Sequence, residues 1–319
     1  MNDIKTVSIV MCTYNGEKFL QEQIDSIIRQ TYPIHELIVQ DDCSTDKTVD
    51  IIKEYTVNYP FIKLYINERN MGYNRNFHSV LRKAQGEFIF ISDQDDVWSP
   101  DKLETMINCI GNHSLCFSHS ASYNFFEEGN IPSPSPISYA PERLLFTNAI
   151  SGHTMLLKRE FVQQITYWNY QMYYDWWLAI NACLADGIIE CQETLAWHRV
   201  HESSAIEMQK ATDAKQAKSN LSPYIKGVIH YRRLQKKSKW KECFGYIYKQ
   251  AACNPQCDIL MQLAGLMLSK SLFSLFKLCN QCMKRRKQIY PYTQNNKLLA
   301  QIRGFCFPLF YAYNNHLFD

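Results

Sequence analysis

The feature that most constrains the fold is an alternation of apolar runs and amphipathic stretches in the first hundred residues. Four runs rich in branched or aromatic residues have the length of buried strands: Thr6–Cys12, Glu36–Val39, Phe61–Ile66 and Phe88–Ile91. Between the runs, apolar residues recur at helical spacing, as in Phe19, Leu20, Ile24, Ile27 and Ile28. Strands that alternate with helices in this way predict a mostly parallel sheet with helices on both faces.

Polar clusters directly follow three of these predicted strands, at Thr13–Gly16, Asp41–Ser44 and Asp93–Asp96. The carboxyl ends of parallel strands meet at one edge of a sheet, where ligands of such proteins bind. The third cluster holds three carboxylates in four residues, and like charges this close repel unless a cation or hydrogen bonds offset them. Mg²⁺ or Mn²⁺ suits such a site, because it binds one or two carboxylates plus substrate phosphates. A solvated acidic turn is the alternative interpretation of this motif.

Charge is distributed unevenly along the chain. The totals of 34 Lys and Arg and 31 Asp and Glu give a net charge of +3. Residues 1–208 nevertheless carry 15 basic against 27 acidic side chains, and residues 209–319 carry 19 against 4. We expect an α/β domain over residues 1–205, a polar linker over 206–223 and a mainly helical, basic C-terminal region over 224–319. The acidic and basic parts are expected to meet different partners.

The twelve cysteines are expected to be reduced thiols. The N-terminus has no apolar stretch long enough for a signal peptide, so we expect a reducing, cytoplasmic compartment. Cys279 and Cys282 have C-x-x-C spacing, but a zinc site needs four ligands and no matching His or Cys cluster accompanies them.

The basic region leaves two interpretations open. Ile259–Leu278 is apolar but interrupted by polar residues, so a transmembrane helix is not expected. An interfacial helix on an anionic membrane fits, with its inserting face formed by residues that include Leu260, Leu263, Leu266, Met267 and Phe273. A soluble helical bundle with solvated lysines fits as well. Nucleic-acid binding is not expected, because no known binding motif is present.

An ordered set of motifs resembles family 2 glycosyltransferases, over roughly the first 205 residues. The motifs follow one another at workable spacing: Val7–Gly16, Val39–Thr48, Asn67–Gly72, Ala84–Ile89, Ile91–Trp98 and Tyr174–Trp177. Ile91–Trp98 (ISDQDDVW) is similar to the family's DxD region in the form common among bacterial surface-polysaccharide enzymes. The resemblance implies the Rossmann-like GT-A fold, a nucleotide-sugar donor, a divalent metal and inversion at the anomeric carbon.

The resemblance also implies roles for single residues. The donor is expected to contact seven residues: Thr13, Tyr14, Asn15, Asp41, Asn70, Arg75 and Asp95. The alternative role for Arg75 is that of an ordinary surface arginine. Asp42 is expected to support the turn in which it lies rather than to contact the donor. The metal is expected on Asp95, Asp96 and His201. His201 lies in Trp197–Ser204, which is similar to the family's Arg-x-His segment but has Ser203 and Ser204 near the place of an asparagine that is often found there.

Asp175 is the expected general base, because it lies in the segment similar to the one that carries the family's base. An inverting transfer needs one carboxylate to deprotonate the attacking hydroxyl. Trp176 and Trp177 are expected to desolvate this carboxylate partly and to offer an aromatic surface to a sugar ring. A helix N-cap is the alternative role for Asp175, and it is compatible with catalysis.

The resemblance therefore implies a metal-dependent, inverting glycosyltransferase that uses Mn²⁺ or Mg²⁺. It is expected to move a sugar from a nucleotide-diphosphate donor to a glycan or lipid-linked acceptor hydroxyl in cell-surface polysaccharide synthesis, such as lipopolysaccharide or capsule. We expect it in the cytoplasm or peripheral on the cytoplasmic face of the inner membrane. A catalytically inactive nucleotide-sugar-binding module is the alternative. A nucleotidyltransferase usually carries a Gly-rich, basic phosphate loop where this chain has Thr13–Gly16.

Overall fold

The computed structural model describes residues 4–123, 139–199, 222–289 and 296–318. The chain divides into two compact units. One comprises residues 1–137 and 150–209, and the other comprises residues 138–149 and 210–319. The short segment 138–149, which interrupts the first unit in sequence, therefore belongs to the second.

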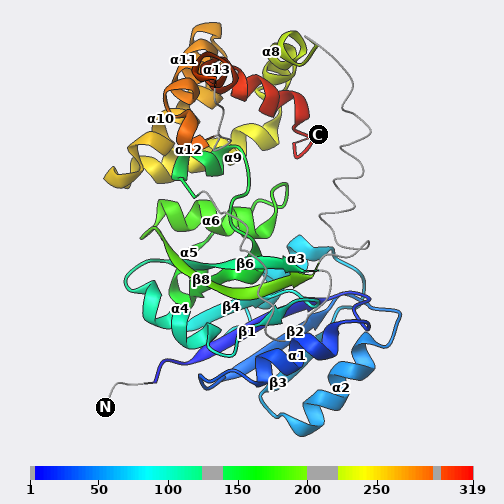
Figure 1. Ribbon diagram of the computed structural model, residues 1–319. Coiled ribbons are helices and arrows are strands. Elements are labelled where there is room, and N and C mark those ends of the chain that lie inside the picture. The colour runs from blue at the N-terminus through cyan, green and yellow to red at the C-terminus, as the bar shows by residue number, and fades with distance from the viewer. Residues whose placement is uncertain (1–3, 124–138, 200–221, 290–295, 319) are drawn as a thin grey trace. The chain divides into compact units, whose positions relative to one another are not determined.

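The first unit is built on a mixed open sheet with helices on both faces (Figure 1). In the described part of the chain its eight strands lie in the order β3-β2-β1-β4-β7-β6-β8-β5. Their bounds are Val7–Thr13 (β1), Glu36–Asp41 (β2), Ile62–Ile66 (β3), Phe88–Ser92 (β4), Val97–Trp98 (β5), Leu115–Tyr123 (β6), Met155–Lys158 (β7) and Ile188–Arg199 (β8). The predicted GT-A-like sheet is confirmed.

The four predicted strands form the parallel half of this sheet. β1 pairs in parallel with β2 and β4, and β2 pairs in parallel with β3. Beyond β4 the sheet becomes mixed, since β7 runs antiparallel to β4 and β6, β8 runs parallel to β6, and β5 runs antiparallel to β8. β2 and β4 are buried along their whole length, which explains why they appear in the sequence as continuous apolar runs rather than alternating ones.

The helices of this unit connect the strands and cover the sheet. They are α1 (Leu20–Ile28), α2 (Thr48–Asn58), α3 (Tyr73–Leu81), α4 (Lys102–Ile110), α5 (Arg159–Gln164) and α6 (Tyr174–Leu184), with a 3₁₀ turn, η2, at Gly152–Thr154. The register places Thr13 beside Asp41 and Met11 beside Ser92. The polar clusters that follow β1, β2 and β4 therefore meet at one edge of the sheet, as the sequence predicts.

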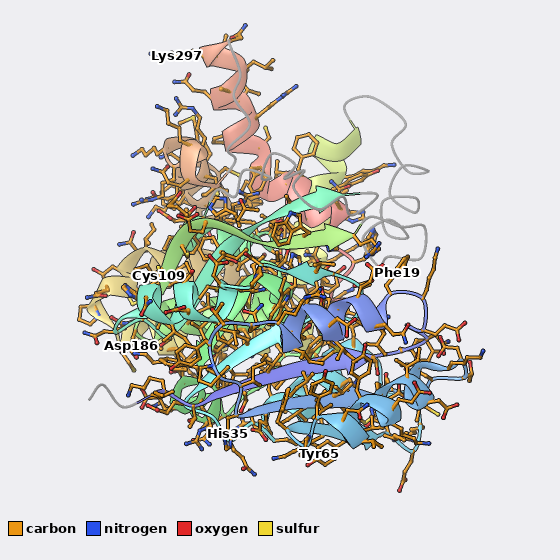
Figure 2. The ribbon with its side chains drawn as sticks, turned by 60° about the horizontal axis from the view of Figure 1, so that its bottom comes forward. Phe19, His35, Tyr65, Cys109, Asp186 and Lys297 are labelled. Atoms are coloured by element: carbon orange, nitrogen blue, oxygen red, sulfur yellow. The ribbon has the colours of Figure 1, made fainter. Side chains whose placement is uncertain are left out.

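The second unit is helical. Its elements are α8 (Ser222–Leu234), α9 (Ser238–Ala252), α10 (Asp258–Leu268), α11 (Leu272–Lys284), α12 (Arg286–Ile289) and α13 (Lys297–Asn314), with 3₁₀ turns η1 (Pro141–Leu145) and η3 (Pro255–Cys257). Trp240 is fully buried at its centre, with the ring of Phe318 at 5.3 Å. Lys297 begins α13 (Figure 2).

The prediction that Ile259–Leu278 presents a membrane-inserting face is wrong for three of the five residues named for that face. Leu260, Leu263 and Met267 of α10 are buried in the core of the helical unit, so they are not available to a membrane. No helix in the described residues has the length and apolar character needed to cross a membrane. None of the twelve cysteines forms a disulfide.

Candidate active site

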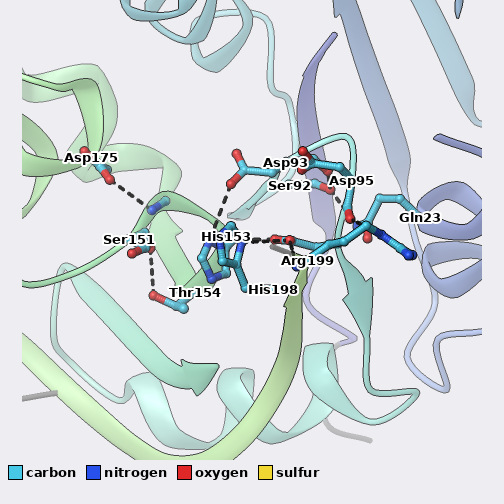
Figure 3. Close-up of polar contacts among 12 residues, drawn as sticks. Gln23, Ser92, Asp93, Asp95, Ser151, His153, Thr154, Asp175, His198 and Arg199 are labelled. Carbon is cyan, nitrogen blue, oxygen red and sulfur yellow. Dashed lines mark hydrogen bonds and ion pairs between the residues drawn. The ribbon is translucent and has the colours of Figure 1, made fainter. Parts of the chain in front are cut away.

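Three side chains from distant parts of the sequence form a buried cluster, which we call the Asp96–His153–His198 cluster. Asp96 follows β4, His153 lies in η2 just before β7, and His198 is near the end of β8. Their possible ligand atoms all lie within 4.8 Å of one another (Figure 3). The two imidazole rings stack, with centroids 5.0 Å apart and planes 6° from parallel.

The charges of the carboxylates decide the protonation of this cluster. Burial alone would lower the pKa of His198, but its hydrogen bond to Asp96, at 3.0 Å, and the negative charges of Asp96, Asp93 and Asp95 raise that pKa to about 9. Burial alone would raise the pKa of Asp96, but the charge of His153 and the hydrogen bonds from His198 and the Arg199 N–H lower it. A proton on His198 therefore balances the carboxylate of Asp96 at neutral pH.

Two buried atoms of the cluster have no hydrogen-bond partner among the described residues: Oδ2 of Asp96 and Nε2 of His153. Buried polar atoms are nearly always hydrogen-bonded, so this pair indicates a site built for something further. A carboxylate with two imidazoles fits a divalent cation. Of the two predicted ions, Mn²⁺ suits this mixed set better, because Mg²⁺ is bound by oxygen ligands.

Lys102 is a neighbour of the cluster that the sequence analysis missed. It begins α4 and is fully buried, with its Nζ donating to the carbonyl oxygen of His153 at 2.6 Å and lying 3.8 Å from the ring centroid of Trp98. Burial lowers its pKa to about 7, although the charges of Asp96 and Asp93 oppose that shift. The hydrogen bond from Lys102 fixes the position of the backbone at His153. The one feature of the sequence that could have pointed to Lys102 is its position six residues after Asp96, at the start of a helix.

Arg199 ties the end of β8 to the acidic segment. Its Nε donates to the backbone oxygen of Asp95 at 3.1 Å, its N–H donates to Asp96 at 3.2 Å, and its guanidinium pairs with Glu22 of α1. Asp95 is half-buried beside these contacts. His201, expected as a metal ligand, lies outside the described residues. Within them, His198 is the histidine of this segment that meets Asp96.

The loops after β1 and β2 form a second polar group. Asp41 is buried and accepts hydrogen bonds from the hydroxyl of Thr13 at 2.8 Å and from the hydroxyl and N–H of Ser44 at 2.6 and 2.8 Å. A carboxylate has about four acceptor positions, so these three bonds leave room for one more donor. Asn15, at a positive φ of 49°, accepts from the N–H of Thr45 at 2.8 Å. The network fixes the backbone on which donor binding is predicted.

Gln94, the second residue of the DQDD run, links the two groups. Its side chain accepts from the N–H of Tyr14 at 2.9 Å and donates to the carbonyl of the same residue at 3.2 Å. A Cβ at Gly16 would overlap the Gln94 amide, which gives this glycine a steric reason. The phenol ring of Tyr14 itself is half exposed to solvent.

Asn70 and Arg75 lie at the start of α3. Asn70 accepts a hydrogen bond from the N–H of Gly72 at 3.0 Å, and Asp42 accepts from the N–H groups of Met71 and Gly72, both at 2.8 Å. Asp42 therefore supports the turn. The guanidinium of Arg75 lies 4.4 Å from the ring centroid of Tyr170 and is exposed.

Asp175 lies in the first turn of α6, one residue beyond the first helical position, and Tyr173 occupies the N-cap. Its Oδ2 accepts from the N–H of Gly152 at 3.2 Å (Figure 3). Its Oδ1 accepts from the N–H of Trp176 at 2.7 Å. The alternative role of Asp175 as the N-cap is therefore wrong, because Asp175 lies inside the helix. The carboxylate is half-buried and fixed by two backbone donors.

The expectation that Trp176 and Trp177 present a sugar-binding surface is wrong. Trp176 is 4% exposed and Trp177 is completely buried, with its indole donating to the carbonyl of Tyr167 at 3.0 Å. Near Asp175, Tyr73 is 49% exposed and forms a pair with the half-buried Tyr173, with ring centroids 6.0 Å apart. Burial, Tyr173 and the charge of Asp175 together raise the pKa of Tyr73, which places the carboxylate close to this pair.

Comparison with known sequences gives one family. Residues 8–173, just over half of the chain, match the profile described as Glycosyl transferase family 2. A Bacillus subtilis protein named as the teichuronic acid biosynthesis glycosyltransferase TuaG is 30% identical over 207 residues, which is 62% of this chain and 80% of the relative. The Escherichia coli UDP-Glc:alpha-D-GlcNAc-diphosphoundecaprenol beta-1,3-glucosyltransferase WfgD is 29% identical over 228 residues, covering 70% and 88%.

Solved structures share the fold. S. aureus TarS 1–349, in complex with UDP-GlcNAc, superposes with a TM-score of 0.58 at 18% identity over 89% of this chain and 81% of that one. The mannosyltransferase PcManGT from Pyrobaculum calidifontis, in complex with GDP-Man and Mn²⁺, superposes with a TM-score of 0.51 at 16% identity over 97% and 86%. Likeness at these identities shows a common fold.

Proposed function

Because the chain belongs to glycosyl transferase family 2, we propose that it moves a sugar from a nucleotide-diphosphate donor to an acceptor hydroxyl, with inversion at the anomeric carbon. The acceptor is a glycan or a lipid-linked sugar, and the pathway is synthesis of a cell-surface polysaccharide. The names of the B. subtilis and E. coli relatives support the pathway and the lipid-linked acceptor. The complexes of two structural neighbours with UDP-GlcNAc and GDP-Man support the donor class.

The observation that carries the proposal is the Asp96–His153–His198 cluster, with two buried atoms that have no hydrogen-bond partner in the described residues. We assign the divalent ion, Mn²⁺ in preference to Mg²⁺, to these three side chains, with Asp95 and His201 as the further ligands that the family resemblance implies. Bound there, the ion supplies positive charge to the diphosphate leaving group. The Mn²⁺ in the PcManGT complex supports this assignment.

The donor lies, in this proposal, over the loops that follow β1 and β2. Asp41 uses its remaining acceptor position for a base N–H, on the backbone that Thr13, Tyr14 and Asn15 provide. Asn70 and Arg75 at the start of α3 face the phosphates. The cation of Arg75 supplies charge for that contact.

Asp175 acts as the general base. As the acceptor oxygen forms its bond to the anomeric carbon, the bond to the diphosphate oxygen breaks, and Asp175 takes the hydroxyl proton. Hydrogen bonds from the N–H groups of Gly152 and Trp176 hold the carboxylate in place for this transfer. Tyr73 and Tyr173, rather than the buried tryptophans, offer the aromatic surface to the acceptor sugar.

The test is acceptor-dependent release of nucleoside diphosphate from a panel of UDP-, GDP- and dTDP-sugars, with a diphospholipid-linked sugar as acceptor. Each reaction is run with Mn²⁺, with Mg²⁺ and with a chelator. We expect release that needs both the acceptor and the ion, with Mn²⁺ giving the higher rate. An inactive binding module would bind nucleoside diphosphate in the presence of Mn²⁺ and release none from any donor.

A further inference from the structure

The last part of the helical unit is unusually basic. From Ile259 to Phe318 the sequence holds eight Lys and Arg residues and no Asp or Glu. Six of these cations are exposed: Lys277 and Lys284 on α11, Lys297 and Arg303 on α13, Lys287 on α12, and Lys270 just before α11. Within the described residues none of the six makes an ion pair, whereas Arg285 pairs with Glu142 at 3.1 Å. The positive charge of these six side chains is therefore not neutralised within the described residues, and it is available to an external anionic partner.

The same two helices expose large apolar side chains. Leu272, Phe273 and Phe276 on α11, and Leu298, Leu299 and Ile302 on α13, are each between 41% and 65% exposed. The two helices pack on each other, as the close approach of Gly304 to the backbone of Met283 shows (Figure 1). Burying large side chains is the usual outcome in a folded unit, and six exposed ones on two adjacent helices are an exception that indicates a contact surface.

These apolar residues form one continuous stripe. On α13, Leu298, Ile302 and Phe305 follow one another at four- and three-residue spacing, so they share one face of the helix. The ring of Phe305 contacts the ring of Phe276 across the helix interface, with centroids 5.6 Å apart. From Phe276 the stripe continues along α11 to Leu272 and Phe273. We call this set, with Leu299, the α11/α13 stripe.

Cations flank the stripe at helical spacing. Lys277 is four residues after Phe273, and its Nζ lies 4.6 Å from the centroid of that ring. Arg303 is four residues after Leu299, and Lys297 directly precedes Leu298 at the start of α13 (Figure 2). Exposed apolar side chains bordered by lysine and arginine are the pattern of helices that lie in the headgroup region of an anionic bilayer.

We propose that the α11/α13 stripe docks the protein on an anionic membrane surface, with its apolar side chains inserted among the lipids and its cations on the headgroups. This goes beyond the proposed transfer reaction, because the binding would occur whether or not the site is active. A second copy of the chain is a poor occupant, since self-association through this face would bring like charges together. A nucleic acid is also a poor occupant, since four of the seven residues of the stripe are aliphatic and cannot stack on bases.

The experiment is sedimentation of the full chain with vesicles of phosphatidylcholine alone and of phosphatidylcholine with phosphatidylglycerol, at low and high ionic strength. The apolar variant carries Phe273→Ser and Phe276→Ser, and the charge variant carries Lys277→Ser and Arg303→Ser. Matched controls are Ile229→Ser and Lys226→Ser, which change an exposed apolar and an exposed basic side chain on α8 of the same unit. Thermal unfolding of each variant verifies that the unit is folded.

We expect the wild-type chain to pellet with the anionic vesicles and only weakly with the neutral ones. The charge variant should bind roughly 25-fold more weakly at low salt, because each lost cation weakens binding about fivefold. The apolar variant should lose the binding that remains at high salt, while both controls behave as wild type. Equal pelleting of folded wild-type and stripe variants would overturn the proposal. So would vesicle binding that is negligible with both lipids, or tight binding of a nucleic acid by the same six cations without lipid.

Discussion

The carboxylate of Asp175 accepts a hydrogen bond at 3.2 Å from the backbone N–H of Gly152, the residue directly before His153. The proposed base and a proposed metal ligand are thus joined by one short backbone connection. Tyr174, next to Asp175, packs its hydroxyl so closely on Gly152 that a Cβ there would overlap it. Lys102 also holds this connection, through its hydrogen bond to the carbonyl of His153. Packed groups therefore set the spacing between the proposed base and the proposed metal ligand.

Asp175→Asn should abolish transfer while donor binding persists. The amide keeps the shape of the carboxylate but cannot accept the proton of the acceptor, so we expect a fall in kcat of roughly 10²- to 10⁴-fold. The dissociation constant of the nucleoside diphosphate with Mn²⁺ should stay within about twofold. Asp50→Asn, on the exposed surface of α2, is the matched control. Near wild-type transfer in the Asp175 variant would move the base elsewhere, to His153 or His201.

His153→Gln and His198→Gln should each weaken Mn²⁺ binding by at least tenfold, because each removes one ligand from the Asp96–His153–His198 cluster. The measurement is a titration of the chain with Mn²⁺, in which binding is detected by calorimetry or by the relaxation of water protons. His201→Gln, titrated in the same way, decides whether the histidine that the family resemblance implies is a ligand too. Unchanged Mn²⁺ affinity in both His153 and His198 variants would remove the cluster from the metal site.

Binding of Mn²⁺ should release a proton near neutral pH. The carboxylate of Asp96 helps to raise the pKa of His198 to about 9, and an imidazole must lose its proton before it can coordinate a metal. The apparent affinity for Mn²⁺ should therefore rise with pH, by up to tenfold per unit, and level off near pH 9. Calorimetry at one pH in two buffers with different ionisation enthalpies counts the released protons. A binding enthalpy that is the same in both buffers would contradict the protonated state of His198.

The environment of Glu36 indicates that the stability of the fold decreases in acid. Burial alone would raise its pKa, but hydrogen bonds from Lys63 at 2.7 Å, Ser8 at 2.6 Å and the N–H of Gln85 at 2.7 Å outweigh burial and lower it. A carboxyl with a lowered folded-state pKa stabilises the fold above its ordinary value of 4.5 and loses that contribution as the pH falls further. Glu36→Gln should cost about 1–3 kcal/mol at pH 7 and much less near pH 3.

Thermal unfolding of both forms across that range tests this prediction. A constant difference between wild type and Glu36→Gln at pH 7 and pH 3 would mean that the titration of Glu36 does not contribute. Glu54→Gln on α2 is a suitable control, since its side chain is exposed and its loss should leave the pH profile unchanged.

The parallel half of the sheet and its polar edge could be predicted because they depend on local patterns. The run that became β4, for example, is an uninterrupted buried segment, and Asp93 directly follows its last residue. The mixed half could not be predicted in the same way. Its short β5 and its long, irregular β8 pair with strands that are distant in sequence, and no local period specifies those partners.

The same limit explains the errors at the site. His153 and His198 reach Asp96 only because β7 and β8 insert into the sheet far along the chain, so neighbouring residues in the sequence could not reveal them. The wrong expectation of a surface formed by Trp176 and Trp177 has a visible cause in the sequence: the run DWWLAINACL is apolar on all sides of a helix, which is typical of a buried one. The burial of the apolar residues of α10 escapes prediction for a related reason: periodicity shows that a face is apolar, but not what covers it.

In the proposed mechanism, nucleotide-diphosphate binding depends on a divalent ion held at Asp96. The most direct test is the thermal unfolding midpoint with UDP, GDP or dTDP, measured with Mn²⁺ and with a chelator, for wild type and Asp96→Asn. A ligand present at about 100 times its Kd stabilises the native state by about 2.7 kcal/mol, so at least one nucleotide should raise the wild-type midpoint by several degrees with Mn²⁺. We expect no rise with the chelator and none in folded Asp96→Asn. An equal rise in either case would show that nucleotide binding does not need an ion held at Asp96.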